Sequence, residues 1–428
     1  MPRWSLLLLL LASCAPQPAV RTALQGNLAD LKRDIQSARQ SGKLDPGAVV
    51  KIAQAVGERE LTSAQGANGA QRVRSLRSCA FPLRAAMEQR STSDDDVAAE
   101  LTLILLETHD ADRNALLTRH ARSTSGAWRA VAARAALRPV DTDLRKAFYF
   151  DADERVRRAA LITAREVHDA GELEALLEAA RVDPDAQSQS LATRAAGAIG
   201  GERAVLALKD LWVQADDTLR IAIVDAWTER ASFVAGGSRE LSIAAESSGG
   251  LAAVSASYAL ARSGGADAAA ANARLRRYIA DGSDDEKRLA LNVALLDAET
   301  TAAIAKAAHD ASPELRVVAW KRLGTIDERR TDAIVALRNL ANQKPASDAE
   351  KRAQADAVSA LADAGDTSVS ATLVKGMQSP ELQTRWRAAH ALASLGDYPN
   401  AASALADDDA NLRSDLACTI LARDHAQR

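Results

Sequence analysis

Aromatic residues make up only 3% of the 428 residues, and glycine is scarce, with 22 residues. Strands favour aromatic and β-branched side chains, so this scarcity argues strongly against an all-β fold. The chain also lacks a basic excess, because its 54 lysines and arginines are matched by 57 aspartates and glutamates. Proteins that bind nucleic acids usually carry such an excess, so we expect no nucleic-acid partner. The hydrophobic content of 47% is mostly alanine and leucine, which favour helices and permit a sizeable core.

The N-terminus has the parts of an export signal. Arg3 supplies a positive charge, residues 6–11 are all leucine, and two small residues then precede Cys14. A membrane-spanning helix needs about 20 apolar residues, so this run is too short to span a bilayer. The sequence therefore predicts a cleaved signal.

The four residues Leu11-Ala12-Ser13-Cys14 resemble the lipobox of bacterial lipoproteins. The resemblance implies that residues 1–13 are removed, that Cys14 is lipidated, and that residues 14–21 form a lipidated tether. The acyl chains expected on such a cysteine are enough for stable membrane anchoring. Because Ala15 is not acidic, the resemblance further implies the outer membrane, facing the periplasm. The alternative is an ordinary secretory signal followed by a coincidental cysteine.

An internal repeat decides the fold class. Ser312-Pro313-Glu314-Leu315 recurs as Ser379-Pro380-Glu381-Leu382, 67 positions later, which is twice 33.5. Serine, proline and glutamate suit the start of a helix, and apolar residues follow each copy at spacings of three and four. Arginines near helix starts recur from Arg129 to Arg413, which is 284 residues in nine steps of about 32. This is the length of a helical hairpin.

Three of these arginines have an aspartate six positions earlier. The pairs are Asp151 with Arg157, Asp310 with Arg316, and Asp407 with Arg413. This pattern resembles the HEAT repeat family and the related phycobilin-lyase-like repeats, over about residues 95–428. The resemblance implies that the aspartates and arginines form a ladder between neighbouring repeats.

We therefore expect an all-α protein, a right-handed α-α superhelix of about ten helical hairpins. Residues 94–428 form the solenoid, and residues 22–93 form a divergent helical cap with helices at 22–39, from Pro46, and at about 70–89. The glycine pairs between residues 236 and 265 predict an irregular stretch. In an open solenoid Cys79 and Cys418, 339 positions apart, cannot meet, so we expect two free, buried thiols.

No strong catalytic motif is present in the sequence. The six histidines form no H-E-x-x-H, and neither C-x-x-C nor G-x-S-x-G occurs. No His-Glu dipeptide occurs either, which argues against the iron site of the deoxyhypusine hydroxylases, and export would separate the chain from the cytoplasmic substrate of phycobilin lyases. We therefore expect no catalysis, no cofactor and no metal.

Two patterns have competing interpretations. His-Asp-Ala occurs at residues 109–111, 168–170 and 309–311. One interpretation is a ladder of metal sites. The other, which we prefer, is that the histidines lie at helix ends, where the negative end of the helix dipole favours them. Three aspartates at residues 94–96 and 407–409 suit helix caps better than calcium, because the spaced ligand pattern of a calcium loop is missing.

Tryptophan and arginine are frequent contact residues at protein interfaces. The candidate partner-binding residues are Trp128, Trp320, Trp386, Arg158, Arg322 and Arg387. The alternative is that the tryptophans fill the alanine-rich core and that the arginines form a solvated face.

These features predict a lipid-anchored scaffold that binds protein partners in the bacterial cell envelope. The second hypothesis is an accessory or regulatory subunit, or a sensor, that acts on a membrane-bound enzyme.

Overall fold

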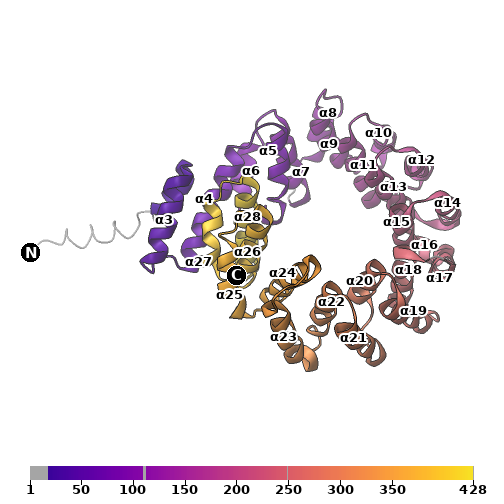
Figure 1. Cartoon of the computed structure of the whole chain (residues 1–428). Coiled ribbons are helices and arrows are strands. Elements are labelled where there is room, and N and C mark those ends of the chain that lie inside the picture. The colour runs from indigo at the N-terminus through magenta and orange to yellow at the C-terminus, as the bar shows by residue number, and fades with distance from the viewer. Residues whose placement is uncertain (1–17, 109–111, 248, 428) are drawn as a thin grey trace, which may run out of the picture. The chain divides into compact units, whose positions relative to one another are not determined.

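The structure is a computed structural model that describes residues 18–108, 112–247 and 249–427. Throughout these ranges every regular element is a helix, which confirms the all-α fold (Figure 1). The chain forms two compact units. Unit 1 contains both ends of the chain, residues 1–110 and 361–428, and unit 2 contains residues 111–360.

Unit 2 consists of helical hairpins whose two helices lie in separate layers (Figure 1). In the first layer, which we call the B layer, each helix packs on the next. The B layer contains α9 (Gly126–Ala135), α11 (Glu154–Val167), α13 (Ala186–Ile199), α15 (Asp217–Thr228), α18 (Gly250–Ser263), α20 (Asp284–Val293) and α22 (Pro313–Leu323). The second layer contains α8 (Arg113–His120), α10 (Thr142–Phe148), α12 (Leu173–Val182), α14 (Gly201–Gln214), α17 (Ser238–Ser247), α19 (Ala268–Asp281), α21 (Ala298–Asp310) and α23 (Asp327–Asn342). Short η2 (Pro139–Asp141) and η3 (Ala170–Glu172) precede α10 and α12.

Unit 1 is built from the first and the last helices of the chain, and α24 (Asp348–Asp363) leads into it. Its N-terminal elements are α2 (Pro18–Gln25), α3 (Leu28–Gln40), α4 (Pro46–Thr62), α5 (Gly66–Arg74), η1 (Arg77–Cys79), α6 (Arg84–Arg90) and α7 (Asp96–Thr108). Its C-terminal elements are η5 (Thr367–Val369), α25 (Ser370–Gly376), α26 (Leu382–Ser394), α27 (Tyr398–Ala401), η6 (Ala402–Ala406) and α28 (Ala410–Gln427). Helix α28 packs along α4, and η6 packs on α3 (Figure 1).

Helix α11 illustrates why these segments are helical. Asp153 caps its first turn by accepting a hydrogen bond from the backbone N–H of Arg155, and Glu154 suits the positive end of the helix dipole. Its buried residues follow a spacing of three and four, and small alanines predominate among them. Small side chains let helices approach closely. At Gly197 on α13 an added Cβ would lie 2.4 Å from the Cβ of Ala226 on α15, so only glycine fits there.

The irregular stretch expected between residues 236 and 265 is present only at its start, between α15 and α17, because residues 250–263 form the regular helix α18. A one-turn helix, α16 (Arg230–Ser232), runs into a π-helix, η4 (Phe233–Gly237). Gly236 has a φ of 115°, which favours glycine. A Cβ at Gly237 would lie 2.8 Å from the carbonyl oxygens of Ser232 and Trp227. The change from regular α-helix to this irregular backbone therefore depends on the glycine pair Gly236 and Gly237.

Several predicted helix boundaries in the N-terminal region are wrong. The single helix expected over residues 22–39 is two helices, because Gly26 has a φ of 84° and Asn27 caps a new helix. Leu24, in the first of these helices, is 54% exposed, whereas Leu31 and Ile35 in the second are buried. The helix expected at about 70–89 is also divided, into α5, η1 and α6. The start of α4 after Asp45 is confirmed.

The expectation of two free thiols is wrong. Cys79 in η1 and Cys418 in α28 form a disulfide, with their Cα atoms 5.1 Å apart. The expectation assumed that the two ends of the solenoid lie far apart. Because α4 and η1 pack directly on α28, the ends meet within one unit.

Candidate functional site

A ladder of arginines joins successive repeats. In the first rung, Nη1 of Arg129 donates to the carbonyl oxygens of Ser123 and Thr124, at 3.0 and 3.1 Å. Its Nε and Nη2 donate to the carboxylate of Asp151 in the following hairpin, at 2.9 and 2.7 Å. A planar guanidinium suits this geometry, because its fixed fork can bind a carboxylate with two parallel hydrogen bonds.

The same arrangement recurs at Arg157 and at Arg385. Nη1 of Arg157 donates to the carbonyls of residues 151 and 152, while its Nε donates to Asp183 at 2.7 Å. Arg385 likewise binds Asp407 at 2.8 Å through Nε. In each case the paired acid follows the arginine by 22 or 26 positions. The ladder thus pairs Asp151 with Arg129, and Arg157 contacts Asp151 only through its carbonyl oxygen.

The last arginine of the ladder, Arg413, binds an acid from the N-terminal part of the chain. Nη1 of Arg413 donates to the carbonyls of Asp407 and Asp408, as in the earlier rungs. Its Nε donates at 2.9 Å to Glu60 of α4, which is 1% exposed and also binds Arg72. Helix α4 therefore supplies the acid that a next repeat would supply. The remaining predicted ladder arginine, Arg316, lies half-buried on α22, and the side chain of Asp310 lies outside what the structure describes.

Each acid of the ladder is held by its own turn. Oδ1 of Asp151 accepts the backbone N–H of Asp153 at 2.8 Å, and Asp153 then caps α11. Asp407 and Asp409 repeat this arrangement before α28, with the N–H of Leu412 as the capped donor. Asp183 and Asp185, before α13, form a third copy that sequence analysis missed. The signal that could have revealed it is the motif Asp-x-Asp directly before a helix.

The ladder shifts the titration of its acids. The hydrogen bonds from Arg129 lower the pKa of Asp151. Burial alone would raise the pKa of Asp407, but the hydrogen bonds from Arg385 and from the backbone N–H of Asp409, together with the nearby arginine charges, lower it. Hydrogen bonding from Arg158 lowers the pKa of Asp185 in the same way.

We expect acid to destabilise the protein through these carboxylates. Because their pKa values are lower in the folded than in the unfolded chain, their stabilisation is complete above the unfolded value, about 4. It is then lost as the pH falls through the folded values. The melting temperature should therefore stay level from pH 7 to about pH 5 and fall below about pH 4.

Asp151→Asn tests this origin. The substitution removes the charge that Arg129 binds, so we expect a loss of about 2 kcal/mol in the free energy of unfolding at pH 7 and a shallower decline in acid. Asp30→Asn is the control, because Asp30 pairs with Arg33 on the surface of α3, and it should change stability by less than about 1 kcal/mol. Equal losses from both variants in urea unfolding would contradict the role of the ladder.

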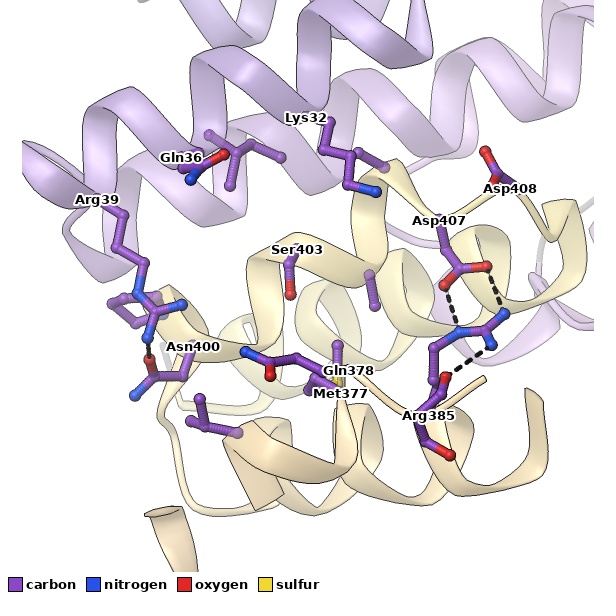
Figure 2. A pocket seen from close by; sticks show the side chains of 16 residues that line it. Lys32, Gln36, Arg39, Met377, Gln378, Arg385, Asn400, Ser403, Asp407 and Asp408 are labelled. Atoms are coloured by element: carbon purple, nitrogen blue, oxygen red, sulfur yellow. Dashed lines mark hydrogen bonds and ion pairs between the residues drawn. The ribbon is translucent and has the colours of Figure 1, made fainter. Parts of the chain in front are cut away.

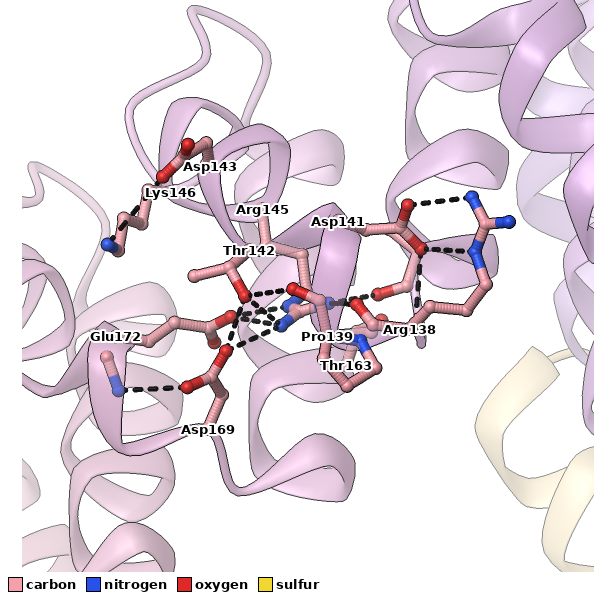
Figure 3. A network of polar contacts seen from close by, with 12 residues as sticks. Arg138, Pro139, Asp141, Thr142, Asp143, Arg145, Lys146, Thr163, Asp169 and Glu172 are labelled. Atoms are coloured by element: carbon pink, nitrogen blue, oxygen red, sulfur yellow. Dashed lines mark hydrogen bonds and ion pairs between the residues drawn. The ribbon is translucent and has the colours of Figure 1, made fainter.

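A buried polar network lies between α10 and η3 in unit 2 (Figure 3). Arg145 is completely buried and donates through Nε to Glu172, also completely buried, at 2.6 Å. Its Nη1 donates to the carbonyl oxygens of Ala136 and Arg138, at 2.9 and 2.8 Å. The hydroxyl of Tyr149 donates to the second oxygen of Glu172 at 2.5 Å. Burial, reinforced by Glu172, raises the pKa of Tyr149, so the phenol keeps its proton.

The structure gives the three candidate tryptophans different environments. Trp128 is 6% exposed and stacks on His120 with ring centroids 4.2 Å apart, so it belongs to the core and is not available to a partner. Trp320 and Trp386 are half-buried on α22 and α26. They contact His309 and His390, with centroids 5.3 and 6.0 Å apart.

The three candidate arginines also differ. Arg158 binds Asp185 at 2.8 Å and Glu154 at 3.4 Å, so it is engaged inside the repeat array. Arg322 donates to the carbonyl oxygen of Ala294 at 2.9 Å. Arg387 is exposed on α26, next to Trp386.

A polar cavity of about 560 Å³ lies in unit 1 between α3 and the C-terminal helices (Figure 2). Lys32 and Arg39 extend into it from α3, and Arg39 donates to Asn400. On the opposite side lies the ladder pair of Arg385 and Asp407. Sequence analysis did not find this cavity, because its two walls are more than 330 positions apart in the chain.

The remaining sequence patterns belong to helix ends. His309 lies in the last turn of α21, and His168 follows α11 with a φ of 57°. His109, like Cys14, lies outside the described residues. In the part of the chain that the structure covers, no group of three or more histidine, cysteine or acidic side chains is arranged to hold a metal. No helix there has the length and apolar character needed to cross a membrane.

These observations define a protein of repeated α-hairpins joined by an arginine ladder. Residues 344–418 match the family model of HEAT repeats. Arrays of such hairpins generally provide surfaces for protein partners. No protein of curated function matches the sequence.

Three solved structures align with most of this chain, but their TM-scores are low. An engineered protein is 19% identical over 74% of this chain and all of its own, with a TM-score of 0.28. Two mutants of Kap121p are 12% and 13% identical, with TM-scores of 0.29 and 0.32. They cover 88% and 91% of this chain, which spans 46% and 48% of theirs. The HEAT assignment rests on the family model alone.

Proposed function

We propose that the chain is a lipid-anchored scaffold of the bacterial cell envelope that binds protein partners and performs no catalysis of its own. The observation that carries this proposal is the disulfide between Cys79 and Cys418. Disulfides persist in oxidising compartments such as the periplasm and are rare in the cytosol. This supports export independently of the lipobox-like residues 11–14, which supply the anchor.

Each unit carries one proposed partner surface, on α22 in unit 2 and on α26 in unit 1. Trp320 and Trp386 are half-buried there, and Arg387 is exposed beside Trp386. A tryptophan held by neighbouring side chains but open on one face can bury further apolar area against a partner at little cost in side-chain entropy. The many ion pairs of the ladder support the role of a scaffold, because they fix the spacing of successive repeats.

Cross-linking of intact cells tests this proposal. We expect the wild-type chain to recover a small set of envelope proteins, and the N-terminal peptide to carry acyl chains on Cys14. The N-terminal peptide of the Cys14→Ser variant should lack the mass of the acyl chains, and this variant should not recover the envelope proteins. In the same experiment, Trp320→Ala combined with Trp386→Ala should lower recovery about tenfold, because such residues dominate binding energies. Leu206→Ala, at a 51% exposed position on α14, is the matched control.

The outcomes separate the parts of the proposal. An unmodified Cys14 would overturn the anchor. Equal recovery with Leu206→Ala and with the tryptophan variant would overturn the proposed surfaces. Recovery of one membrane-bound enzyme, whose activity changes when the chain is added, would instead favour an accessory or regulatory subunit.

A further inference from the structure

An apolar groove of about 510 Å³ lies in unit 1 beside the N-terminal helix. It runs between α2, α4, the turn after η1 and the end of α28. Its apolar lining includes Val20, Leu24, Val50, Phe81, Pro82 and Leu421. Leu24 is 54% exposed and Phe81 is 63% exposed, although both are large apolar residues. These two side chains therefore stand at the surface with much of their area uncovered.

The groove is built on firmly packed elements. Helix α2 buries Ala19, Thr22 and Ala23, and the hydroxyl of Thr22 donates to Asp34 of α3 at 2.5 Å. Val20 and Leu24, four positions apart, lie together on another face of the same helix. The ring of Phe81 stacks on His425 with centroids 4.4 Å apart. The exposed apolar groups are thus held in place and do not result from a loosely packed terminus.

The charges around the groove favour an apolar occupant. Lys51 lines it together with the acidic residues Glu58 and Asp424. Charges of both signs give no strong attraction to an acidic or a basic partner. Burial of the exposed leucine and phenylalanine is the main gain available to anything that covers this surface.

The position of the groove along the chain identifies the occupant. Only three residues separate Cys14 from Pro18, where α2 begins, and Val20 already lines the groove. Four steps of extended chain span at most about 14 Å. The headgroup layer on each side of the hydrocarbon is itself about 5 to 7 Å thick. A lipid on Cys14 therefore holds α2 at the membrane surface.

We propose that this groove is the face that contacts the membrane, with Leu24 and Phe81 inserted at the boundary between headgroups and hydrocarbon. The inference rests on the anchoring of Cys14 in the proposed function. It adds a second attachment to the acyl chains and a fixed orientation of unit 1 on the lipid surface. The acyl chains hold the protein at the membrane, and the groove determines which face of unit 1 meets the lipid.

The orientation is tested with a tether that does not depend on lipidation in the cell. The mature chain carries a histidine tag in place of residue 14 and is held on phosphatidylcholine vesicles by a nickel-chelating lipid. An environment-sensitive dye is attached to Leu24→Cys or, as a control in the same unit, to Leu382→Cys, which replaces a residue that is 38% exposed. Since the native cysteines form the disulfide, the new thiol is the one labelled. Nitroxide lipids should quench the dye at position 24 about twofold or more and leave position 382 unchanged.

A second measurement uses the untethered mature chain. Leu24→Ser combined with Phe81→Ser should lower its partition onto the same vesicles about tenfold, because the apolar area of both residues is lost. Val213→Ser, at a 75% exposed position on α14, should change partition little. Circular dichroism melts establish that all three forms are folded.

Equal quenching at positions 24 and 382, or none at 24, would overturn the proposal. A dimer without lipid that the double serine variant converts to a monomer would also overturn it, in favour of a second copy as the occupant. Mass analysis of the native N-terminal peptide reports on Cys14 separately. An unmodified Cys14 with quenching at 24 would refute the anchor and leave the lipid-binding face intact.

Discussion

Arg145→Ala should cost about 3 to 5 kcal/mol in the free energy of unfolding. The substitution leaves the carboxylate of Glu172 completely buried without its cation. It also removes the donors to the carbonyl oxygens of Ala136 and Arg138. A buried charge without a partner is costly because the low-dielectric interior cannot replace its hydration.

The expected loss of stability comes from leaving the charge of Glu172 unpaired. A double variant that removes both charges distinguishes this cost from the contribution of the ion pair itself. Arg145→Met combined with Glu172→Met removes both charges and should recover part of the loss, because the two ions no longer have to be desolvated. Arg203→Ala is the control in the same unit. Arg203 pairs with Glu174, and the two side chains are 74% and 63% exposed, so the loss should be below about 1 kcal/mol.

Urea unfolding at pH 7 measures all four proteins. Losses of equal size for Arg145→Ala and Arg203→Ala would show that the buried pair contributes nothing beyond a surface pair. A double variant less stable than Arg145→Ala would show that the two ions do not account for the loss.

The ladder illustrates what the sequence could and could not predict. The spacing of six between Asp151 and Arg157 is real, but it reflects a local contact: Nη1 of the arginine binds the carbonyl oxygen of the aspartate. The ion pair lies in the next hairpin, 22 or 26 positions away, where loop length varies. A fixed spacing marks the local contact, whereas only the packing of repeats identifies the distant partner.

The Arg145 network had no comparable signal. Arg145, Tyr149 and Glu172 belong to a single hairpin junction, so no repetition marks them. Arginine and glutamate are also common on exposed helix faces, and their burial depends on how η3 packs against α10. Helix positions in unit 2 follow local patterns of caps and apolar spacing, while buried polar contacts depend on tertiary packing.

The N-terminal region shows the limit most clearly. The sequence predicts a divergent helical cap over residues 22–93 and gives it no partner at the other end of the chain. Yet Glu60 of α4 takes the ladder arginine of α28, Arg413, and Cys79 bonds to Cys418. Neither Glu60 nor Cys79 carries a repeat signature, because each meets its partner more than 330 positions away. Contacts between the two ends of a chain leave no trace in a local periodicity.

Loss of the disulfide through Cys79→Ser combined with Cys418→Ser should destabilise unit 1 by about 3 to 5 kcal/mol. The bond joins residues 339 positions apart, so it removes a large amount of chain entropy from the unfolded state. The remaining contacts between the ends, including the pair of Arg413 and Glu60, then have to hold α4 on α28 without a covalent link.

Thermal unfolding and hydrogen exchange together test this expectation. Reductant should lower the melting temperature of the wild type to that of the double serine variant and have no effect on the variant. Ser78→Ala, which removes only a hydroxyl 3.1 Å from the sulfur of Cys418, should melt close to the wild type. Exchange protection should fall in α4 and α28 and persist in α11 and α13, because the latter pack within unit 2. A uniform fall through both units would mean that the disulfide stabilises the whole chain as one cooperative body, whereas an unchanged melt would mean that packing between the ends suffices without it.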